Sequence, residues 1–572
     1  MARRLVLFAE PRPPAPGPIM ETALQKHERI KREQNPWDEL PRLFGAMRGG
    51  VGAIAPADLN TRLRWWGLYT QGDGQGAFGE AAPCFMLRVR VPNGMLTSAQ
   101  AAAVARIAQR HGRGLVDVTV RQNLQLHWLE AEVLPDIFHQ LWEAGLTSQA
   151  ACGDDPRNLT GCPIAGLDPG EFADASPLTL AVNRALLASG DFYNLPRKFK
   201  LCISGCRHWC PNPEINDAAF TAYPGAGDSR WFGLRVGGGL SNAPMLALPL
   251  PVRVSWHQVV PVSLALAGLF RDCAELRLNR GQARLKFLFL RHGWTVARFR
   301  AELERRLGFA LEDAEPDAPP APEFRDHLGL HPERHPEWAY AGLSVSRGRL
   351  SAAQLAAVAE AADRWAGGEV RATAMQNLVL PHVRRGAAAE LGEHLRRWNL
   401  PLAASSFRRG MVSCTGKEFC KLAVTETKAF AAELTAELER RMPGYPVPIR
   451  INLNGCPNSC GQHWIADVGL QGTRVKTPDG AEDGYDVFLG GSLGAGATLA
   501  RKTLGRVRSR ELGARLESLF RHFERERAPE ESFRDFVARS TPADLEAVLG
   551  RLPEAPMLVK LRPADAALEV AE

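Results

Sequence analysis

The sequence predicts a mixed α/β protein, internally duplicated into two pseudo-symmetric halves. Short motifs recur in the same order at offsets of 250 to 255 residues. The matching segments are 96–105 with 350–359, 122–126 with 376–380, 160–161 with 415–416, and 205–210 with 455–460. Alternating apolar segments are separated in both halves by an alanine-rich helical segment that starts at Ser or Thr. A chain of 572 residues is also too long to fold around a single hydrophobic core, so several domains are expected.

The predicted elements follow this repeat along the chain. The first half begins with a strand over 85–91, a helix that starts at Ser or Thr within 96–105 and a second strand over 118–128. The second half repeats the order with a strand over 340–345, a helix that starts at Ser within 350–359 and a strand over 369–380. The proline-rich segment 311–324 separates the halves. After about Arg501 the tail is predicted to be helical, with apolar faces supplied by Phe520, Phe523, Phe533 and Phe536.

Composition excludes several classes of protein. The net charge of +7 is spread along the chain without a basic run flanked by aromatic residues, which argues against nucleic-acid binding. No apolar run approaches the roughly 18 residues that cross a bilayer. The apolar run at the N-terminus is too short for a signal peptide. The proline-rich segment Pro11 to Pro18 predicts a mobile start of the chain. We expect a cytoplasmic protein, since paired thiols suit a reducing compartment.

Four cysteines in two short groups carry the strongest signal. Cys414 and Cys420 are separated by five residues, and Cys456 and Cys460 by three. Pairs of thiolates on short loops can converge on one soft metal centre. A zinc site more often uses pairs separated by two residues, and ordinary buried cysteines would not need this spacing. The pattern therefore indicates a metal centre.

Cations in the first half have no counterpart in the second. Arg88 and Arg90 are two residues apart on a predicted strand and share a face, whereas the second half has Gly342 and Ser344 at the equivalent positions. The next predicted strand has Arg121, Asn123, Gln125 and His127 at alternate positions, so we expect these side chains on one face. Lys198 and Lys200 form a further same-face pair. These groups predict an anion-binding face on the first half.

The cysteine pattern resembles that of the sirohaem-containing nitrite and sulfite reductases. The resemblance covers nearly the whole chain except the first 50 or so residues. It implies sirohaem and a 4Fe–4S cluster between the two halves. Cys414, Cys420, Cys456 and Cys460 would hold the cluster, and Cys460 would also bridge to the sirohaem iron. An acidic ferredoxin would be the electron donor, and we expect a monomer.

The resemblance also implies roles for the first-half cations. Arg88 and Arg157 match substrate-binding arginines, and Lys198 with Lys200 matches the pair on the open face of the macrocycle. Residues expected to contact the macrocycle are Arg121, Asn123, Gln125, His127, Gln376 and Asn377. His127 could instead satisfy a hydrogen bond in the core. An isolated arginine is more often part of a surface ion pair, but the same-face pairing and the asymmetry between halves favour function here.

The implied domain boundaries follow from the same resemblance. The predicted order is an N-terminal extension (1–50), a first ferredoxin-like subdomain (51–145), a first sirohaem- and anion-binding domain (146–310), a linker (311–325), a second ferredoxin-like subdomain (326–400), a cluster and sirohaem domain (401–500) and a helical C-terminal segment (501–572).

The predicted reaction is the six-electron reduction of nitrite to ammonia, with reduction of sulfite to sulfide as the alternative. Gly461, Gln462 and His463 after the last cluster cysteine resemble the nitrite enzymes. Lys200 is more typical of the sulfite enzymes. Tyr69 and Cys152 match a pair that is covalently linked in some sulfite reductases. Two other classes stay open: a non-catalytic electron carrier, and a zinc protein, neither of which needs the cationic face.

A second cysteine group lies in the first half. Cys206 and Cys210 are the image of Cys456 and Cys460, and Cys162 and Cys202 lie nearby in the sequence. No pair separated by five residues accompanies them. A packed relic of the duplication is the simpler interpretation, and a second metal site is the alternative.

Overall fold

The computed structural model describes residues 21–33, 35–223, 230–478 and 480–550. It is a mixed α/β protein of two pseudo-symmetric halves, as the repeat predicts. The proline-rich start, 11–18, lies outside the described residues. No helix within the described ranges is both long and apolar enough to span a membrane.

Two five-stranded sheets form the centre of the molecule and exchange a strand with each other. The first has the order β1-β2-β5-β4-β13 and the second β11-β12-β15-β14-β3. β13 belongs to the second half but pairs with β4, and β3 belongs to the first half but pairs with β14. The bounds are β1 Leu68–Gly72, β2 Ala81–Val89, β3 Met95–Thr97, β4 Leu115–Val118, β5 Leu124–Glu130, β11 Gly329–Pro332, β12 Trp338–Leu343, β13 Arg349–Ser351, β14 Glu369–Ala372 and β15 Leu378–Arg384.

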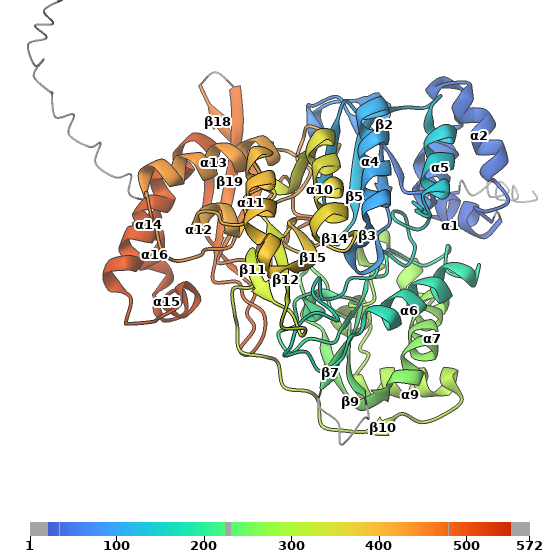
Figure 1. The fold of residues 1–572 in the computed structure, drawn as a ribbon. Helices are drawn as coiled ribbons and strands as arrows, with labels where there is room; N and C mark the ends of the chain where they lie inside the picture. Colours follow the sequence, from blue (N-terminus) through green and yellow to red (C-terminus); the bar gives the residue numbers. More distant parts are fainter. Residues whose placement is uncertain (1–20, 34, 224–229, 479, 551–572) are drawn as a thin grey trace, which may run out of the picture.

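Equivalent helices cover these sheets and pack against each other. The helices are α4 Ser98–His111 with α5 Leu134–Glu143, and α10 Ala352–Trp365 with α11 Ala388–Arg397. Each alanine-rich helix begins at a capping box, Thr97 with Gln100 in α4 and Ser351 with Gln354 in α10. α4 and α10 lie side by side at the centre of Figure 1. One continuous apolar core therefore spans both halves.

Each half also contributes a second sheet with its own core. The first has the order β10-β9-β8-β7-β6 and the second β16-β17-β18-β19-β20. The bounds are β6 Leu201–Ser204, β7 Ala218–Tyr223, β8 Trp231–Val236, β9 Leu248–Ser255, β10 Glu312–Asp313, β16 Met411–Ser413, β17 Ile451–Asn454, β18 Val468–Thr477, β19 Gly480–Leu489 and β20 Arg501–Arg508. β6 and β7 are parallel, as are β16, β17 and β18. The carboxyl ends of these parallel strands position the cysteine turns.

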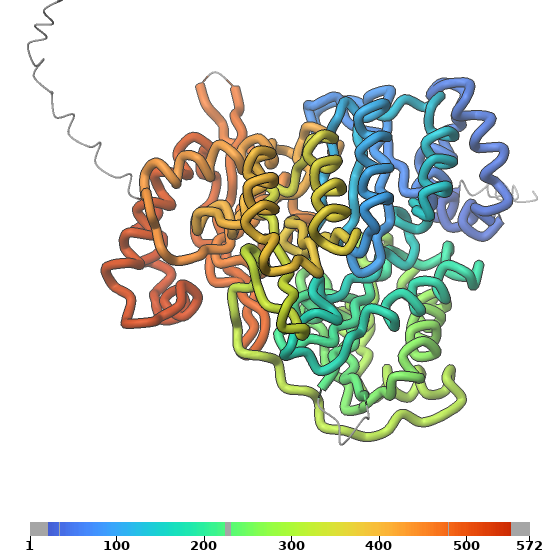
Figure 2. The backbone as a smooth tube through the Cα atoms, in the orientation of Figure 1, coloured from blue at the N-terminus to red at the C-terminus, as the bar shows by residue number. Residues whose placement is uncertain are grey.

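The remaining helices pack around these sheets at the edges of the molecule. They are α1 Ala23–Glu33, α2 Leu40–Arg48, α3 Leu63–Trp65, α6 Ser176–Ala188, α7 Val259–Asp272, α8 Phe287–Arg291, α9 Val296–Leu307, α12 Ser406–Gly410, α13 Lys428–Arg441, α14 Leu512–Glu526, α15 Phe533–Arg539 and α16 Pro542–Gly550. The four predicted phenylalanines of α14 and α15 are all buried in one core. Figure 2 shows the segment between the halves as an extended path along the edge of the molecule.

Three details of the predicted elements are wrong. The segments 118–128 and 369–380 are not single strands, because each contains a tight turn, with Gln122 and Gln376 at positive φ. Arg121 and Asn123 therefore lie in a hairpin turn and do not share a strand face with Gln125. The tail after Arg501 starts with a strand, β20, before its helices. The predicted linker also contributes the short strand β10 to the first half.

Candidate active site

Two neighbouring parallel strands bring the four predicted cluster cysteines together. Cys414 directly follows β16, and Cys456 lies two residues beyond β17. The Cys414 N–H donates to the Leu453 carbonyl over 3.0 Å, and the Gly455 N–H donates to the Cys414 sulfur over 3.3 Å. A Cβ on Gly461 would lie 2.5 Å from the Leu453 carbonyl oxygen, so glycine permits this close approach.

The environment of these thiols fits a polynuclear cluster. Burial, with the nearby Cys460 thiolate, raises the pKa of Cys414 to about 12 and that of Cys456 to about 11. Such groups become thiolates when a metal centre offsets their charge. Among the described residues, no three sulfurs of this set lie within 4.8 Å of one another. This spread suits the corners of a cluster rather than a single ion. Cys460 is exposed, as a bridge to a second group requires.

Arg88 is held in place by a neighbouring strand. It lies on β2 directly opposite Gln125 on β5. Its guanidinium donates to Gln125 Oε1 over 2.9 and 3.1 Å, to the Ala151 carbonyl over 3.1 Å and to the Cys152 sulfur over 2.9 Å. Gln125 thus orients Arg88, a role that the sequence did not reveal. Arg88 remains half-exposed and available to an anion.

A loop positions Arg157 beside Arg88. Both arginines donate to the Ala151 carbonyl, and Arg157 also donates to the Gly153 carbonyl over 2.7 Å. The Arg157 N–H donates to the Phe199 carbonyl over 2.7 Å, which places it next to Lys198 and Lys200. Burial opposes the charge of Arg157, but Tyr69 and Cys152 nearby raise its pKa overall.

Arg90 and Tyr69 both contact the loop that carries Arg157. Arg90 is buried and donates to the carbonyls of Ala150, Pro156 and Arg157, so it fixes the loop and does not face an anion. The Gly153 N–H lies 3.4 Å from the Tyr69 hydroxyl oxygen. Tyr69 therefore lies close to the loop segment that follows Cys152.

Lys198 and Lys200 are the least compensated cations of the site. Within the described residues, neither ammonium group has a hydrogen bond or an ion pair. Burial lowers the pKa of Lys198 to about 7, with the thiolate of Cys460 opposing this effect. Burial and the neighbouring Arg284 and Arg121 lower the pKa of Lys200 well below its usual value. Lys198 of the first half therefore lies near the exposed Cys460 of the second half.

Several buried polar atoms between the halves have no hydrogen-bond partner among the described residues. Arg121 donates to Asn216 Oδ1 over 2.8 Å and to the Asn158 carbonyl over 2.5 Å, but its Nε is buried without a partner in the described structure. The same holds for Arg157 Nε, Asn454 Nδ2 and Ser459 Oγ. Sirohaem carries many carboxylates, and these donors fit such a group.

Three other predicted macrocycle contacts have side-chain oxygens that accept hydrogen bonds from the protein backbone. Asn123 Oδ1 accepts from the Val91 N–H over 3.2 Å, and its equivalent, Asn377, accepts from the Val345 N–H over 3.0 Å. Gln376 donates to the carbonyls of Val118 and Ser413 and accepts from the Ser413 N–H, each over 3.0 Å.

His127 is fully buried, as its alternative interpretation allowed. Its Nε2 lies 3.1 Å from Asp117, and its ring stacks on Phe419 at 3.9 Å. Burial lowers the pKa of this imidazole.

A buried carboxylate that the sequence did not reveal supports the loop that carries Cys152 and Arg157. Asp154 lies between Cys152 and Arg157 and accepts from Lys31, Arg197 and Arg280, with His27 3.1 Å away. Burial opposes its charge, but these cations hold its pKa well below the usual value. Lys31 and His27 belong to α1, so the N-terminal extension stabilises the site. Because Lys31 and His27 are far from Asp154 in the sequence, no local pattern predicted these contacts.

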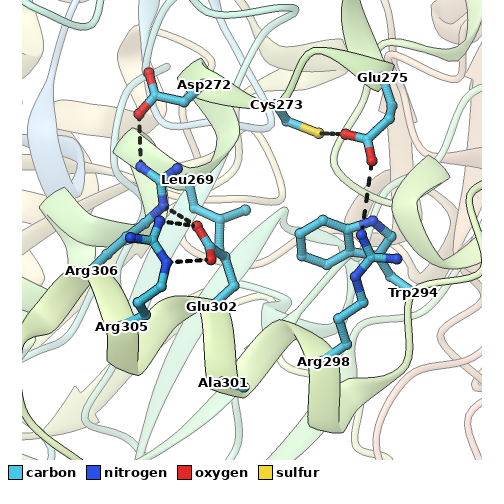
Figure 3. Close-up of a pocket in the computed structure, with 10 residues that line it drawn as sticks. All are labelled: Leu269, Asp272, Cys273, Glu275, Trp294, Arg298, Ala301, Glu302, Arg305 and Arg306. Atoms are coloured by element: carbon cyan, nitrogen blue, oxygen red, sulfur yellow. Dashed lines mark hydrogen bonds and ion pairs between the residues drawn. The ribbon is translucent and has the colours of Figure 1, made fainter.

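A cavity of about 430 Å³ lies away from these residues, between α7 and α9 (Figure 3). Glu302 pairs with Arg305 and Arg306, and the Cys273 thiol donates to Glu275. None of the predicted site residues lines it, and we assign it no part in the chemistry.

Comparison with known proteins agrees with this arrangement. Residues 152–311 and 404–551 match the family model described as the nitrite and sulphite reductase 4Fe-4S domain, and residues 80–144 and 331–397 match the nitrite/sulfite reductase ferredoxin-like half domain. The chain is 36% identical over 540 residues to a sulfite reductase (ferredoxin) of Mycobacterium tuberculosis, covering 91% of this chain and 96% of that protein. It is 37% identical over 491 residues to a ferredoxin–nitrite reductase of Leptolyngbya laminosa, covering 84% and 93%.

A solved structure has the same fold. It is titled the structure of the Mycobacterium tuberculosis NirA protein and superposes with a TM-score of 0.86 at 35% sequence identity. The similarity covers 91% of this chain and 97% of that one.

Proposed function

Because the chain belongs to the nitrite and sulphite reductase family, we propose that it reduces nitrite to ammonia with electrons from a ferredoxin. Its cofactors are a sirohaem and a 4Fe–4S cluster. The observation that carries the choice of nitrite is the uncharged turn after Cys460. Gln462 brings no cation, and burial lowers the pKa of His463 to about 4, so this imidazole is neutral. A singly charged anion needs fewer cations than a doubly charged one.

The first-half cations bind and polarise the substrate. Arg88 and Arg157 hold the anion through directed N–H donors, because the loop at Ala151 aligns both guanidinium groups. Lys198 and Lys200 add ammonium donors on the side that faces Cys460. They stabilise negative charge on the oxygens and deliver protons as the N–O bonds break. When bound, the coupled sirohaem and cluster supply single electrons to the anion.

The residues around this set have a supporting role. Arg121 would pair with carboxylates of the sirohaem, since its Nε has no partner among the described residues. Gln125 orients Arg88. Asn123, Asn377 and Gln376 fix the two hairpin turns, since their side-chain oxygens accept from backbone N–H groups. His127 supports β5 through the contact of its Nε2 with Asp117.

A surface next to Cys420 is suited to the donor. Phe78 is 67% exposed and Leu422 is 62% exposed, and both lie among cations. Lys421 adjoins Leu422, and the Arg474 guanidinium lies 5.7 Å from the Phe78 ring centroid. An apolar patch with a cationic rim complements an acidic ferredoxin.

Lys421→Glu should raise KM for ferredoxin without changing turnover with methyl viologen. Lys26→Glu, on the distant helix α1, is the matched control and should change neither; equal effects of both would contradict this docking surface.

Sulfite is the second candidate, and the contact of Arg88 with Cys152 favours it. In this arrangement Cys152 and Tyr69 lie beside both substrate arginines. A linked Tyr69–Cys152 pair would appear as a peptide lacking two hydrogen atoms.

Side-by-side turnover tests the proposal. Purified holoenzyme with reduced methyl viologen is given nitrite and sulfite in parallel, and ammonia and sulfide are measured. A higher kcat/KM for nitrite is expected. Gln462→Arg should shift the ratio toward sulfite by adding a cation. Faster formation of sulfide by the native enzyme would overturn the choice of nitrite.

A further inference from the structure

The first half contains a compact thiol cluster that the reaction does not use. The sulfurs of Cys162, Cys206 and Cys210 all lie within 4.8 Å of one another. Thr160 forms a parallel bridge with Cys202 of β6, which brings the loop of Cys162 beside the turn that carries the other two cysteines. Cys202 itself is buried on β6 and does not join the cluster. All three cluster sulfurs are free thiols.

The turn of this cluster has the backbone of the iron–sulfur turn in the other half. Trp209 and Ser459, which precede the last cysteine of each turn, have φ values of 53° and 54°. Asn212 and Gln462 have φ values of 55° and 65°. The Cys210 N–H donates to the Cys206 sulfur over 3.5 Å, and the Ser204 hydroxyl lies 3.4 Å from that sulfur. The first half thus retains the backbone of a thiolate-ligand turn.

The sulfur spacing suits one ion. A tetrahedral ion with metal–sulfur bonds near 2.3 Å holds its sulfurs about 3.8 Å apart. The first-half sulfurs lie within 4.8 Å of one another, so a small inward shift would bring them to that spacing. The four cluster cysteines of the second half do not gather any three sulfurs so closely among the described residues. The two equivalent cysteine turns therefore suit different metal centres: the first-half sulfurs suit a single ion, and the second-half sulfurs suit a cluster.

The surroundings supply charge balance and room for a further ligand. Arg325 lies near the thiols: burial opposes its charge, but Cys210, Asp168 and Cys162 raise its pKa overall. Tyr340 and Val379 from the second half close the apolar side. Cys210 also lines a cavity of about 70 Å³, which is large enough for water. A solvent molecule there can complete the coordination of a metal ion.

We propose that Cys162, Cys206 and Cys210 bind one thiophilic metal ion of the zinc or copper(I) class, separate from the sirohaem and its cluster. Three thiolates are the donors such ions prefer. Binding displaces the three thiol protons to solvent. The site fixes the first-half loop against the second half, because Arg371 donates to the Pro163 and Ala165 carbonyls beside Cys162. The proposal does not depend on whether nitrite or sulfite is the substrate.

Metal analysis of the holoenzyme tests this site directly. Protein purified without chelators and dialysed should contain one zinc or copper ion per chain in addition to about five iron atoms. Cys206→Ser should lose that ion and keep the iron content and the sirohaem spectrum. Cys202→Ser is the matched control, a buried cysteine of the same half outside the cluster, and should keep the ion. An ion retained equally by both variants would overturn the proposal.

X-ray absorption of the native enzyme gives a second test that needs no variant. At the zinc or copper edge, a shell of three sulfurs near 2.3 Å is expected. A shell of oxygen and nitrogen alone, or no zinc or copper at stoichiometric level, would refute the site. Nitrite turnover measured on the same samples separates this result from the proposed function, since activity can persist when the ion is absent.

Discussion

The two halves share one framework but use equivalent positions in opposite ways. In the first half, Arg88 on β2 lies opposite Gln125 on β5 and reaches toward the loop at Ala151. In the second, Gly342 on β12 lies opposite Val379 on β15. A Cβ on Gly342 would lie 1.7 Å from the His327 carbonyl oxygen, so the chain after the linker covers this position. The second half therefore has no room for an arginine at the position where the first half carries Arg88.

A cavity beside Met375 shows a second difference between the halves. Met375 is equivalent to Arg121, and it lines the 70 Å³ cavity with Trp209, Asn452 and residues 320–323 of the linker. The first-half equivalent, Arg121, lies near Lys200, which also lies near Lys198. The second-half cavity instead mixes Arg325 and Arg450 with Glu214 and Glu323, so among the described residues only the first half gathers cations without matching carboxylates. The function of each half follows from a few side chains and from the path of the linker.

Removing the bridging cysteine should have the largest effect. Cys460→Ser is expected to abolish nitrite reduction and to change the visible spectrum, because Cys460 is the proposed bridge between the cluster and the sirohaem. The equivalent first-half variant, Cys210→Ser, should leave the sirohaem spectrum unchanged. Absorption spectra and methyl viologen assays check both. An active Cys460→Ser enzyme with a native spectrum would refute the bridging role.

Arg88→Met should lower kcat/KM for nitrite by roughly 10²–10³, the usual loss for one preorganised donor. Gln125→Leu should cost about tenfold, because it removes only the groups that orient Arg88. Arg384→Met, an exposed arginine at the end of β15, is the control and should leave turnover unchanged. If Gln125→Leu lost as much as Arg88→Met, Gln125 would itself contact the substrate.

A buried ion pair between the halves should govern stability in acid. Asp117 on β4 accepts from Arg349 on β13 over 2.8 and 3.2 Å. Burial opposes its charge, but Lys428, His127 and Arg349 keep its pKa below the usual value near 4. The carboxylate therefore stabilises the folded state above pH 4, and this contribution is lost as the pH falls toward the folded-state pKa.

Asp117→Asn should destabilise the protein by about 3–5 kcal/mol at pH 7 and by less in acid. Thermal unfolding of the holoenzyme at several pH values measures this difference. Asp136→Asn, which removes an exposed pair with Arg48, should have almost no effect. A loss that is independent of pH would show that the carboxylate charge is not responsible.

The smallest effects should come from the two equivalent glutamines of the hairpin turns. Gln122 donates to the Ala372 carbonyl of the other half over 3.0 Å, and Gln376 donates to the Val118 carbonyl over 3.0 Å. Each leucine variant should cost about 1–3 kcal/mol, since it leaves backbone groups unpaired. Calorimetry should give similar losses for the two variants and none for Gln109→Leu, which is exposed on α4. Unequal losses would show that the hairpins are not equivalent.

Local patterns predicted much of this architecture. The repeat placed the two halves, and the capping residues Thr97 and Ser351 marked the starts of α4 and α10. Spacing alone identified the four cluster cysteines as a group. The boundary between the ferredoxin-like and sirohaem parts of each half stays a prediction.

The remaining features depend on contacts that sequence patterns do not contain. Apolar alternation continues through Arg121 and Asn123, so the hairpin turn was hidden. β20 is rich in exposed arginine and lysine, which concealed a strand at a sheet edge. The pairing of Asp154 with Lys31 joins residues more than a hundred positions apart. Such partners become visible only once the chain has folded.

The exchange of β3 and β13 also has a consequence for protein synthesis. β4 ends at Val118, but its partner β13 begins at Arg349. At ordinary rates of translation, the ribosome takes roughly ten to fifty seconds to make the chain between them. During that interval β4 is an open sheet edge on a nascent chain, which other strands can pair with. Folding of the first half is therefore completed only when the second half has been made.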